Sequence, residues 1–162
     1  MTDKSSDAPG VVIFPPLIPL LLLVVGIVLN LIIPLDLLIH LPLQVRILVG
    51  TIALVVGLRI VIGANRIFRR IGTNVNPSQP ALVLATTGIF TWTRNPMYIG
   101  GGIVLLGIAI VGALDWVPLL LVLSLPLLHC GIILREERYL ERKFGDEYRR
   151  YKSKVPRYWW RF

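Results

Sequence analysis

Four long apolar stretches limit what this chain can fold into. They cover residues 15–33, 43–63, 97–114 and 116–134 of a 162-residue chain in which 55% of the residues are hydrophobic. A bilayer core about 30 Å thick needs roughly 20 apolar residues per helical span. Each stretch is close to that length. The sequence therefore predicts an all-α, polytopic membrane protein with about four transmembrane helices.

The polar segments are too short to form a separate soluble module. We expect one membrane domain over residues 1–162. Its third and fourth apolar stretches should form a helical hairpin, because little more than Asp115 separates them. The predicted order is a mobile N-terminus (1–14), two N-terminal spans (15–63), a cytoplasmic connector (64–96), the hairpin (97–134) and a cytoplasmic tail (135–162).

Basic residues are concentrated after the second and fourth apolar stretches. The net charge is +8; ten of the 17 Lys and Arg residues follow Leu134, and four more lie between Arg66 and Arg94. The other two connections, 35–42 and 112–116, contain neither Lys nor Arg. The positive-inside rule then places both termini in the cytoplasm, in our expectation at a bacterial inner membrane. The charge indicates attraction to anionic headgroups rather than to nucleic acid.

The cysteine and histidine content argues against a metal site. Cys130 is the only cysteine, which excludes an internal disulfide and a Cys-based zinc site. The two histidines, His40 and His129, fall on opposite sides of the membrane in this topology. We therefore expect no bound metal.

A regularly spaced row of apolar side chains runs along the tail. The row consists of Leu140, Phe144, Tyr148 and Tyr151. Its intervals of four, four and three residues are typical of one helical face, and Lys and Arg occupy much of the remainder. Basic amphipathic helices of this kind lie in membrane surfaces. We expect a C-terminal amphipathic interfacial helix.

A polar motif, Arg94-Asn95-Pro96, precedes the third apolar stretch. The residue before a proline is disfavoured in a helix, whereas proline suits the first helical position. A helix should therefore begin near Pro96, and its free N–H groups and the Arg94 guanidinium would suit a carboxylate ligand. The alternative is a proline-initiated span with Arg94 as an interfacial anchor.

Three consecutive glycines, Gly100, Gly101 and Gly102, follow Tyr98 by two residues. Small residues in a membrane helix allow a second helix to approach closely. They also allow a ligand to approach the backbone. The sequence leaves both interpretations open.

Two acidic residues, Glu136 and Glu137, follow the fourth apolar stretch, and His129 lies seven residues before Glu136 on the same face of a regular helix. If the helix ends there, two carboxylates at its negative end would suit a ligand cation such as an ammonium or a sulfonium. If the helix continues, they form an ordinary charged face that Arg135 and Arg138 can neutralise.

These motifs resemble those of the isoprenylcysteine carboxyl methyltransferase and phospholipid methyltransferase superfamily of integral membrane enzymes. The resemblance covers about residues 72–157. Its most specific points are two ordered signatures separated by an apolar hairpin. These are Arg94-Asn95-Pro96-Met97-Tyr98-Ile99-Gly100, and Arg135-Glu136-Glu137 continued by Leu140, Phe144-Gly145, Glu147-Tyr148, Tyr151 and Val155-Pro156-Arg157.

The resemblance implies an S-adenosylmethionine pocket open to the cytoplasm, with an adjacent opening for a lipid-like substrate. Arg94, Glu136 and Glu137 would be catalytic. The implied residues around the cofactor are Arg94, Asn95, Pro96, Tyr98, Gly101, His129, Glu136 and Glu137.

We expect a methyltransferase that acts at the membrane on a lipophilic acceptor, first of all on the carboxylate of a prenylated thiol-carboxylate or related isoprenoid acid. Phospholipid amine methylation is the alternative. Asn95 stands where eukaryotic carboxyl methyltransferases typically have His and phospholipid enzymes often have Asn, so it does not favour the prenylcysteine substrate. A non-catalytic module whose tail binds anionic lipid or a partner is the alternative of a different class.

Overall fold

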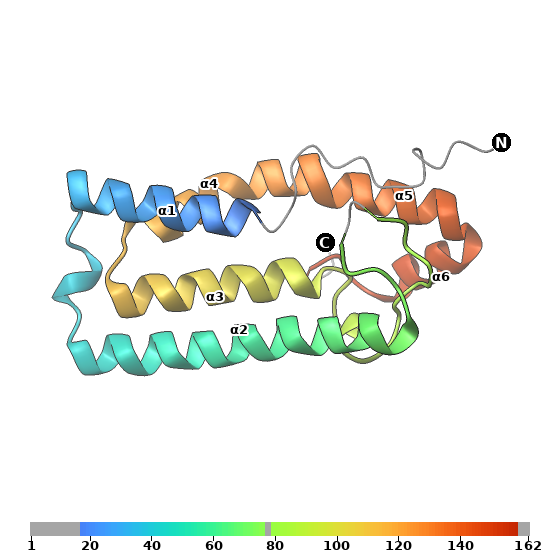
Figure 1. The fold of residues 1–162 in the computed structure, drawn as a ribbon, viewed down its shortest axis with the longest axis horizontal. Helices are drawn as coiled ribbons and strands as arrows, with labels where there is room; N and C mark the ends of the chain where they lie inside the picture. Colours follow the sequence, from blue (N-terminus) through green and yellow to red (C-terminus); the bar gives the residue numbers. More distant parts are fainter. Residues whose placement is uncertain (1–16, 77–78, 159–162) are drawn as a thin grey trace. The chain divides into compact units, whose positions relative to one another are not determined.

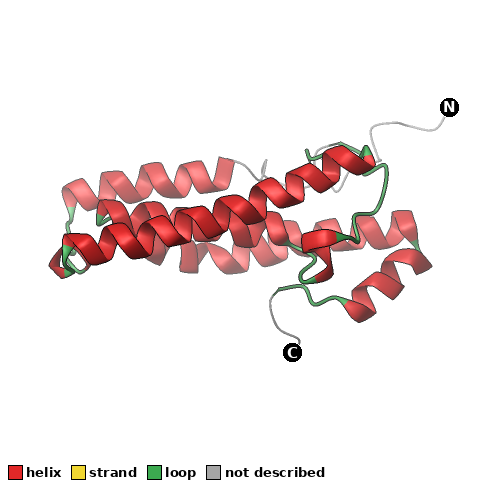
Figure 2. Ribbon diagram, turned by 90° about the horizontal axis from the view of Figure 1, so that it is seen from below, coloured by secondary structure: helices red, strands yellow, loops and turns green. Residues whose placement is uncertain are grey.

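A computed structural model describes residues 17–76 and 79–158 of the chain, and every regular element within them is helical (Figures 1 and 2). The predicted mobile N-terminus (1–14) lies outside the described residues. The elements are α1 (Leu17–Ile32), η2 (Leu38–His40), α2 (Leu43–Ile71), η3 (Gly88–Thr91), α3 (Pro96–Gly112), α4 (Trp116–Leu128), the π-helical η4 (His129–Ile133), α5 (Leu134–Phe144) and α6 (Asp146–Lys154).

Two helices are long and apolar enough to cross a bilayer. They are α2 and the continuous helix Trp116–Phe144, each of 29 residues. Only 22% of the most apolar part of each is buried, so most of this surface faces outward. The helices α1 and α3 are apolar but shorter, with 16 and 17 residues. The all-helical prediction is confirmed, whereas the prediction of four spans is supported for two helices and stays a prediction for the others.

The described residues form two compact units. The first, which we call the bundle unit, comprises residues 17–61 and 98–125. The second, the polar unit, comprises residues 62–97 and 126–158. Each is described by itself below.

In the bundle unit, α2 and α3 approach so closely that their backbones touch. A Cβ atom on Gly57 would lie 2.7 Å from the carbonyl oxygen of Gly100, and one on Gly107 would lie 2.9 Å from that of Gly50. Glycine is required at these positions because any side chain would force the helices apart. By contrast, a Cβ on Gly101 would meet no heavy atom within 4 Å. The glycine run therefore combines a packing residue, Gly100, with a position that packing does not explain.

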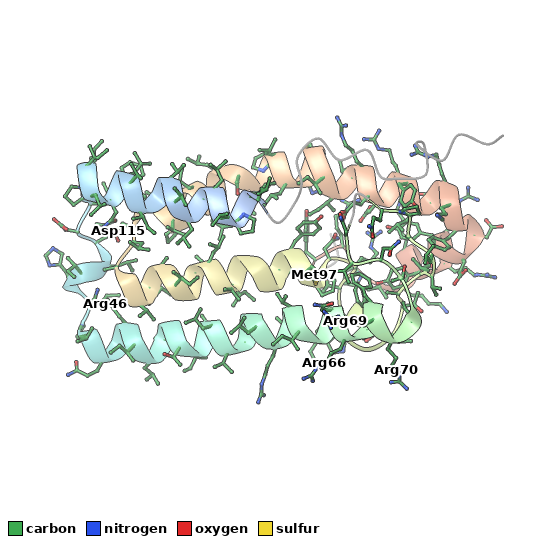
Figure 3. The ribbon with its side chains drawn as sticks, in the orientation of Figure 1. Arg46, Arg66, Arg69, Arg70, Met97 and Asp115 are labelled. Atoms are coloured by element: carbon green, nitrogen blue, oxygen red, sulfur yellow. The ribbon has the colours of Figure 1, made fainter. Side chains whose placement is uncertain are left out.

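The turn between α3 and α4 is tied to the turn that follows α1. Asp115 is buried, and its two carboxylate oxygens accept the backbone N–H groups of Leu37 at 3.1 Å and Leu38 at 2.8 Å. The side-chain oxygen of Asn30 accepts the N–H of Asp115 at 3.1 Å. Figure 3 labels Asp115 at this turn. The charged residue that separates the two apolar stretches thus satisfies backbone donors that would otherwise be unpaired.

The polar unit has its own apolar core. Its buried members are Ala64, Leu84, Ala85, Phe90, Tyr148, Tyr151 and Val155. The rings of Phe68 and Phe90 lie 5.0 Å apart. Because this core needs a covering face, α2 continues to Ile71, beyond the predicted end of the second span at Gly63. The first part of the predicted cytoplasmic connector, residues 64–71, is thus helical, and its cytoplasmic position stays a prediction.

The apolar row of the tail also faces this core. Leu140 and Phe144 pack against it, and the rings of Tyr148 and Tyr151 lie inside it. The row is divided between two helices, because Gly145 has a φ of 53° and breaks the chain between α5 and α6. The amphipathic tail therefore consists of two helices whose apolar face packs on protein, and its position at the membrane interface stays a prediction.

Candidate functional site

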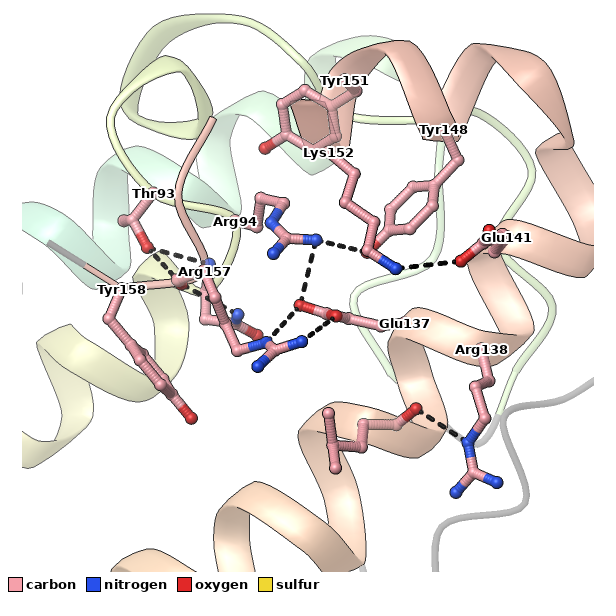
Figure 4. Close-up of polar contacts among 12 residues, drawn as sticks. Thr93, Arg94, Glu137, Arg138, Glu141, Tyr148, Tyr151, Lys152, Arg157 and Tyr158 are labelled. Atoms are coloured by element: carbon pink, nitrogen blue, oxygen red, sulfur yellow. Dashed lines mark hydrogen bonds and ion pairs between the residues drawn. The ribbon is translucent and has the colours of Figure 1, made fainter. Parts of the chain in front are cut away.

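The two sequence signatures meet at one buried carboxylate, that of Glu137 (Figure 4). Arg94 Nη1 lies 3.2 Å from Glu137 Oε1. Arg157 donates from Nε to Oε1 at 2.9 Å and from Nη2 to Oε2 at 2.8 Å. The side chains of Arg94 and Glu137 are only 8% and 7% exposed, and that of Arg157 is 29% exposed. Two guanidinium groups and one carboxylate leave this cluster with a net positive charge.

The backbone around Arg157 is bonded to the turn that carries Arg94. The carbonyl oxygen of Pro156 accepts the N–H of Arg94 at 3.0 Å. The carbonyl oxygen of Arg157 accepts the Thr93 hydroxyl at 2.8 Å and the Asn95 side-chain amide at 3.0 Å. These bonds hold the end of the described chain against the first signature, and they give Asn95 a structural partner.

The start of α3 lies where the sequence predicts it, at Pro96. Asn95 is buried, and its N–H donates to the Thr93 hydroxyl at 3.2 Å. Tyr98 and Gly101 follow on α3 and are half-buried, but they belong to the bundle unit, whereas Asn95 and Pro96 belong to the polar unit.

His129 begins the π-helical segment η4 and contacts the end of the described chain. Its Nδ1 lies 2.6 Å from the hydroxyl oxygen of Tyr158. Three residues earlier, Pro126 lies inside α4 and removes one helical N–H donor, which favours local rearrangement. The expectation that His129 and Glu136 share one face assumed a regular α-helix between them. Residues His129–Ile133 are π-helical, and a π-helical turn holds more residues than an α-helical turn, so a spacing of seven no longer places the two on one face.

The two neighbouring glutamates have different environments. The helix continues through Glu136 and Glu137, as the charged-face interpretation assumed. Glu137, however, is 5% exposed and bonded to two arginines, so it is not part of a solvated face. Glu136 is half-buried. The carboxylate of Glu137 is therefore committed to guanidinium groups of the protein itself.

Tyr148 adds a neutral hydroxyl to the cluster. Arg94 Nη1 donates to its oxygen at 3.4 Å, which leaves the Tyr148 proton as a donor. Burial, with the nearby Glu137 carboxylate as a smaller cause, raises the pKa of Tyr148 to about 12. The neighbouring Tyr151 hydroxyl donates to the carbonyl oxygen of Phe90 at 2.7 Å. The sequence placed Tyr148 in the apolar row of the tail and Arg157 in the second signature, but it assigned neither of them to the cofactor site.

The cluster retains capacity for an anion. Arg94 Nε is buried and has no hydrogen-bond partner. Burying an unpaired donor is costly, so a ligand oxygen at this position would remove the penalty. Among the described residues, no group of three or more His, Cys, Asp or Glu side chains could hold a metal ion.

Comparison with known proteins places the chain in a family. Residues 45–147 match the model of a family described as phospholipid methyltransferase. The match covers more than half of the chain and includes Arg94 and Glu137. The chain belongs to this family. The resemblance drawn from the two signatures is thereby confirmed at the level of the superfamily. Membership indicates a membrane-associated methyltransferase, and S-adenosylmethionine is the methyl donor that such a family implies.

A second similarity is short. The chain is 77% identical over 26 residues to an uncharacterized protein of Haemophilus influenzae (strain ATCC 51907 / DSM 11121 / KW20 / Rd). This region is 16% of the chain and 41% of that protein, so the chain matches less than half the length of this relative. No solved structure matches the chain.

Proposed function

We propose that this phospholipid methyltransferase family member transfers a methyl group from S-adenosylmethionine to a lipophilic acceptor at the membrane surface. The observation that carries the proposal is the buried cluster of Arg94, Glu137 and Arg157, with its net positive charge and its unpartnered Arg94 Nε. A purely structural ion pair gains nothing from a buried donor without a partner.

The residues of the cluster fit the charges of the cofactor. S-adenosylmethionine supplies a methyl group already activated by a sulfonium centre. Arg94 and the N–H groups at the start of α3 would hold its carboxylate. Glu136 would form an ion pair with its ammonium group, and Glu137 would orient Arg94. Such positioning accounts for most of the catalysis that a displacement of this kind requires.

Four further residues complete the proposed site. We assign Asn95 and Pro96 to the turn that presents Arg94, and His129 to the cofactor site, while Tyr98 is assigned to the cofactor from the resemblance to the family. Gly101 would allow the cofactor to approach the backbone of α3, because a side chain there meets nothing in the protein. Arg94, Glu136 and Glu137 are the proposed catalytic residues, of which Glu137 acts through the arginines it binds.

The acceptor that the cluster favours is a carboxylate, as in a prenylated thiol-carboxylate or a related isoprenoid acid. A net positive site attracts an anionic acceptor and repels a protonated amine. A carboxylate oxygen also needs no proton removed before it attacks the methyl carbon. The protein then has only to align the acceptor oxygen with the bond between the sulfonium sulfur and the methyl carbon, which breaks as the new bond forms.

A phospholipid amine is the second candidate, and the description of the matching family favours it. An ammonium acceptor must first lose a proton, for which Glu136 or His129 would serve as the base. In either case we propose an inner-membrane protein with both termini in the cytoplasm, since most of the basic residues follow the apolar stretches on that side.

Calorimetric titration of the detergent-purified protein with S-adenosylmethionine tests the cofactor assignment. The titration compares the wild type with Glu136→Gln, with Glu136→Gln/Glu137→Gln and with Glu147→Gln, which changes an exposed glutamate on α6. We expect binding to weaken in the first two variants and to persist in the third. Absence of binding by folded wild-type protein, with and without added lipid, would overturn the methyltransferase proposal and favour a non-catalytic lipid-binding module.

The product then identifies the acceptor. Incubation with labelled cofactor and a farnesylated thiol-carboxylate should give a base-labile methyl ester. A base-stable methylated amine, formed from phosphatidylethanolamine instead, would assign the second candidate.

A further inference from the structure

Three exposed arginines occupy the outer face of the last two turns of α2. Arg66, Arg69 and Arg70 are separated by three and one residues, so the helical period places them on one side of the helix. Figure 3 labels all three near the end of α2. The opposite side of the same turns packs on the core of the polar unit through Ala64, Ile67, Phe68 and Ile71. We call the outer side the arginine face. The arginine face points away from the core of the polar unit, because the opposite side of the helix packs on that core.

The arginine face has no counter-charge from the described part of the protein. None of its three guanidinium groups forms a hydrogen bond or an ion pair with a described residue. On α6 of the same unit, by contrast, Arg149 binds Glu141 at 3.3 Å and Asp146 at 2.8 Å, and Lys152 binds Glu141 at 3.1 Å. A negative helix end favours cations in its last turn, but it does not account for three on one outward face without an acidic neighbour.

The unit that carries the face exposes side chains typical of a membrane interface. Ile62 precedes Arg66 by one turn of α2 and is 45% exposed. Elsewhere in the unit, the Trp92 side chain is 67% exposed and that of Leu82 is 59% exposed. Exposed tryptophan and aliphatic side chains in a unit that also exposes arginine are typical of the level where the hydrocarbon core meets the headgroups. The helix that carries the face is one of the two that are long and apolar enough to cross a bilayer.

We propose that Arg66, Arg69 and Arg70 form a binding surface for the phosphate groups of anionic phospholipids. Guanidinium groups bind phosphate oxygens in pairs, and basic residues beside a membrane helix attract anionic headgroups. The surface is separate from the Arg94–Glu137 cluster, whose arginines are bound to the Glu137 carboxylate. Its function does not depend on methyl transfer and can be tested without an acceptor.

Native mass spectrometry of the full chain in detergent tests the proposal. The wild type is incubated with phosphatidylglycerol or with phosphatidylcholine, and retained lipid is counted. We expect retention of phosphatidylglycerol in preference to phosphatidylcholine. Arg66→Gln/Arg69→Gln/Arg70→Gln should lower the affinity for phosphatidylglycerol about tenfold or more, given the contribution of each basic residue near an anionic surface.

The control removes the same charge from another surface, in the variant Arg142→Gln/Arg149→Gln/Arg150→Gln on α5 and α6. It should retain phosphatidylglycerol nearly as the wild type does. An equal loss in both variants would mean that net charge alone attracts the lipid, and would overturn the assignment to the arginine face. Release of the lipid by inorganic phosphate at equal concentration would assign the surface to free phosphate and overturn the lipid proposal. All six arginines are exposed, so both variants should fold. A melting temperature close to that of the wild type checks this.

Discussion

Arg157 holds both carboxylate oxygens of Glu137, with Nε 2.9 Å from Oε1 and Nη2 2.8 Å from Oε2. This paired geometry fixes the plane of the carboxylate and leaves Oε1 within 3.2 Å of Arg94 Nη1. The side-chain hydrogen bond to Glu137 also raises the pKa of Arg157, so this guanidinium stays charged. Glu137 is thus the anion that allows two arginines to approach each other.

The first prediction concerns the stability that Glu137 provides. In Glu137→Gln, the buried Arg94 loses its counter-charge while remaining out of water. Breaking a buried ion pair in this way costs about 3–5 kcal/mol. We expect a loss of this size in the free energy of unfolding, measured by denaturant titration in detergent. Glu147→Gln makes the same change on an exposed residue and should have little effect. Equal stability of the two variants would contradict the structural role of Glu137.

The second prediction separates two adjacent glycines. A Cβ on Gly100 would lie 3.0 Å from the carbonyl oxygen of Gly57, whereas one on Gly101 meets no atom within 4 Å. Gly100→Ala should therefore lower the free energy of unfolding by about 1–3 kcal/mol, the usual cost of overpacking. Gly101→Ala should leave stability unchanged or slightly higher. If Gly101 lies beside the cofactor, as proposed, Gly101→Ala should weaken S-adenosylmethionine binding in calorimetry while the protein stays stable.

The third prediction concerns the turn that Asp115 holds. Asp115→Asn keeps one acceptor oxygen and must leave either the Leu37 or the Leu38 N–H without a partner. An unsatisfied donor in a partly buried site costs about 1–3 kcal/mol, which should appear as a lower melting temperature. The matched control is Asp36→Asn, because Asp36 is exposed and has a φ of 56° that asparagine also tolerates. A melting temperature that falls equally in both variants would count against the proposed role of Asp115.

The fourth prediction concerns ionisation of the buried tyrosine. Burial raises the pKa of Tyr148 from 10.0 to about 12. The folded state then keeps a proton that the unfolded state loses, so the free energy of unfolding should be unaffected below pH 10 and should fall as the pH rises from 10 to about 12. Ultraviolet titration of phenolate should show Tyr148 ionising late, and Tyr148→Phe should remove one late-titrating group. Ionisation of all five tyrosines near the ordinary value would contradict the buried position.

Local features of the fold followed from single residues. Pro96 marks the start of α3 because proline suits the first helical position, and Gly145 separates α5 from α6 because it adopts a positive φ. The end of α2 could not be found in this way. Residues 64–71 contain both Arg and apolar side chains, and only the packing of Phe68 on Phe90 explains why they are helical.

The sequence singled out residues of the candidate site but did not indicate how their charges are paired. The signatures identified Arg94 and Glu137, and the alternatives for Glu137 were a ligand-binding carboxylate or a solvated helix face. The structure gives a third arrangement, in which Arg157 and Arg94 occupy the carboxylate. Such a pairing has no sequence signal, because surface and buried charges look alike until the fold determines which are removed from water.

The sequence by itself determined that the chain is helical and rich in apolar surface, and it determined the family. A helix satisfies its backbone hydrogen bonds within one segment, so residue type and spacing are sufficient to predict it. Only the tertiary structure decided which glycine packs, which glutamate is buried and which arginines lack a counter-charge. These properties depend on contacts between residues far apart in the chain, and their energies arise from exclusion of water at those contacts.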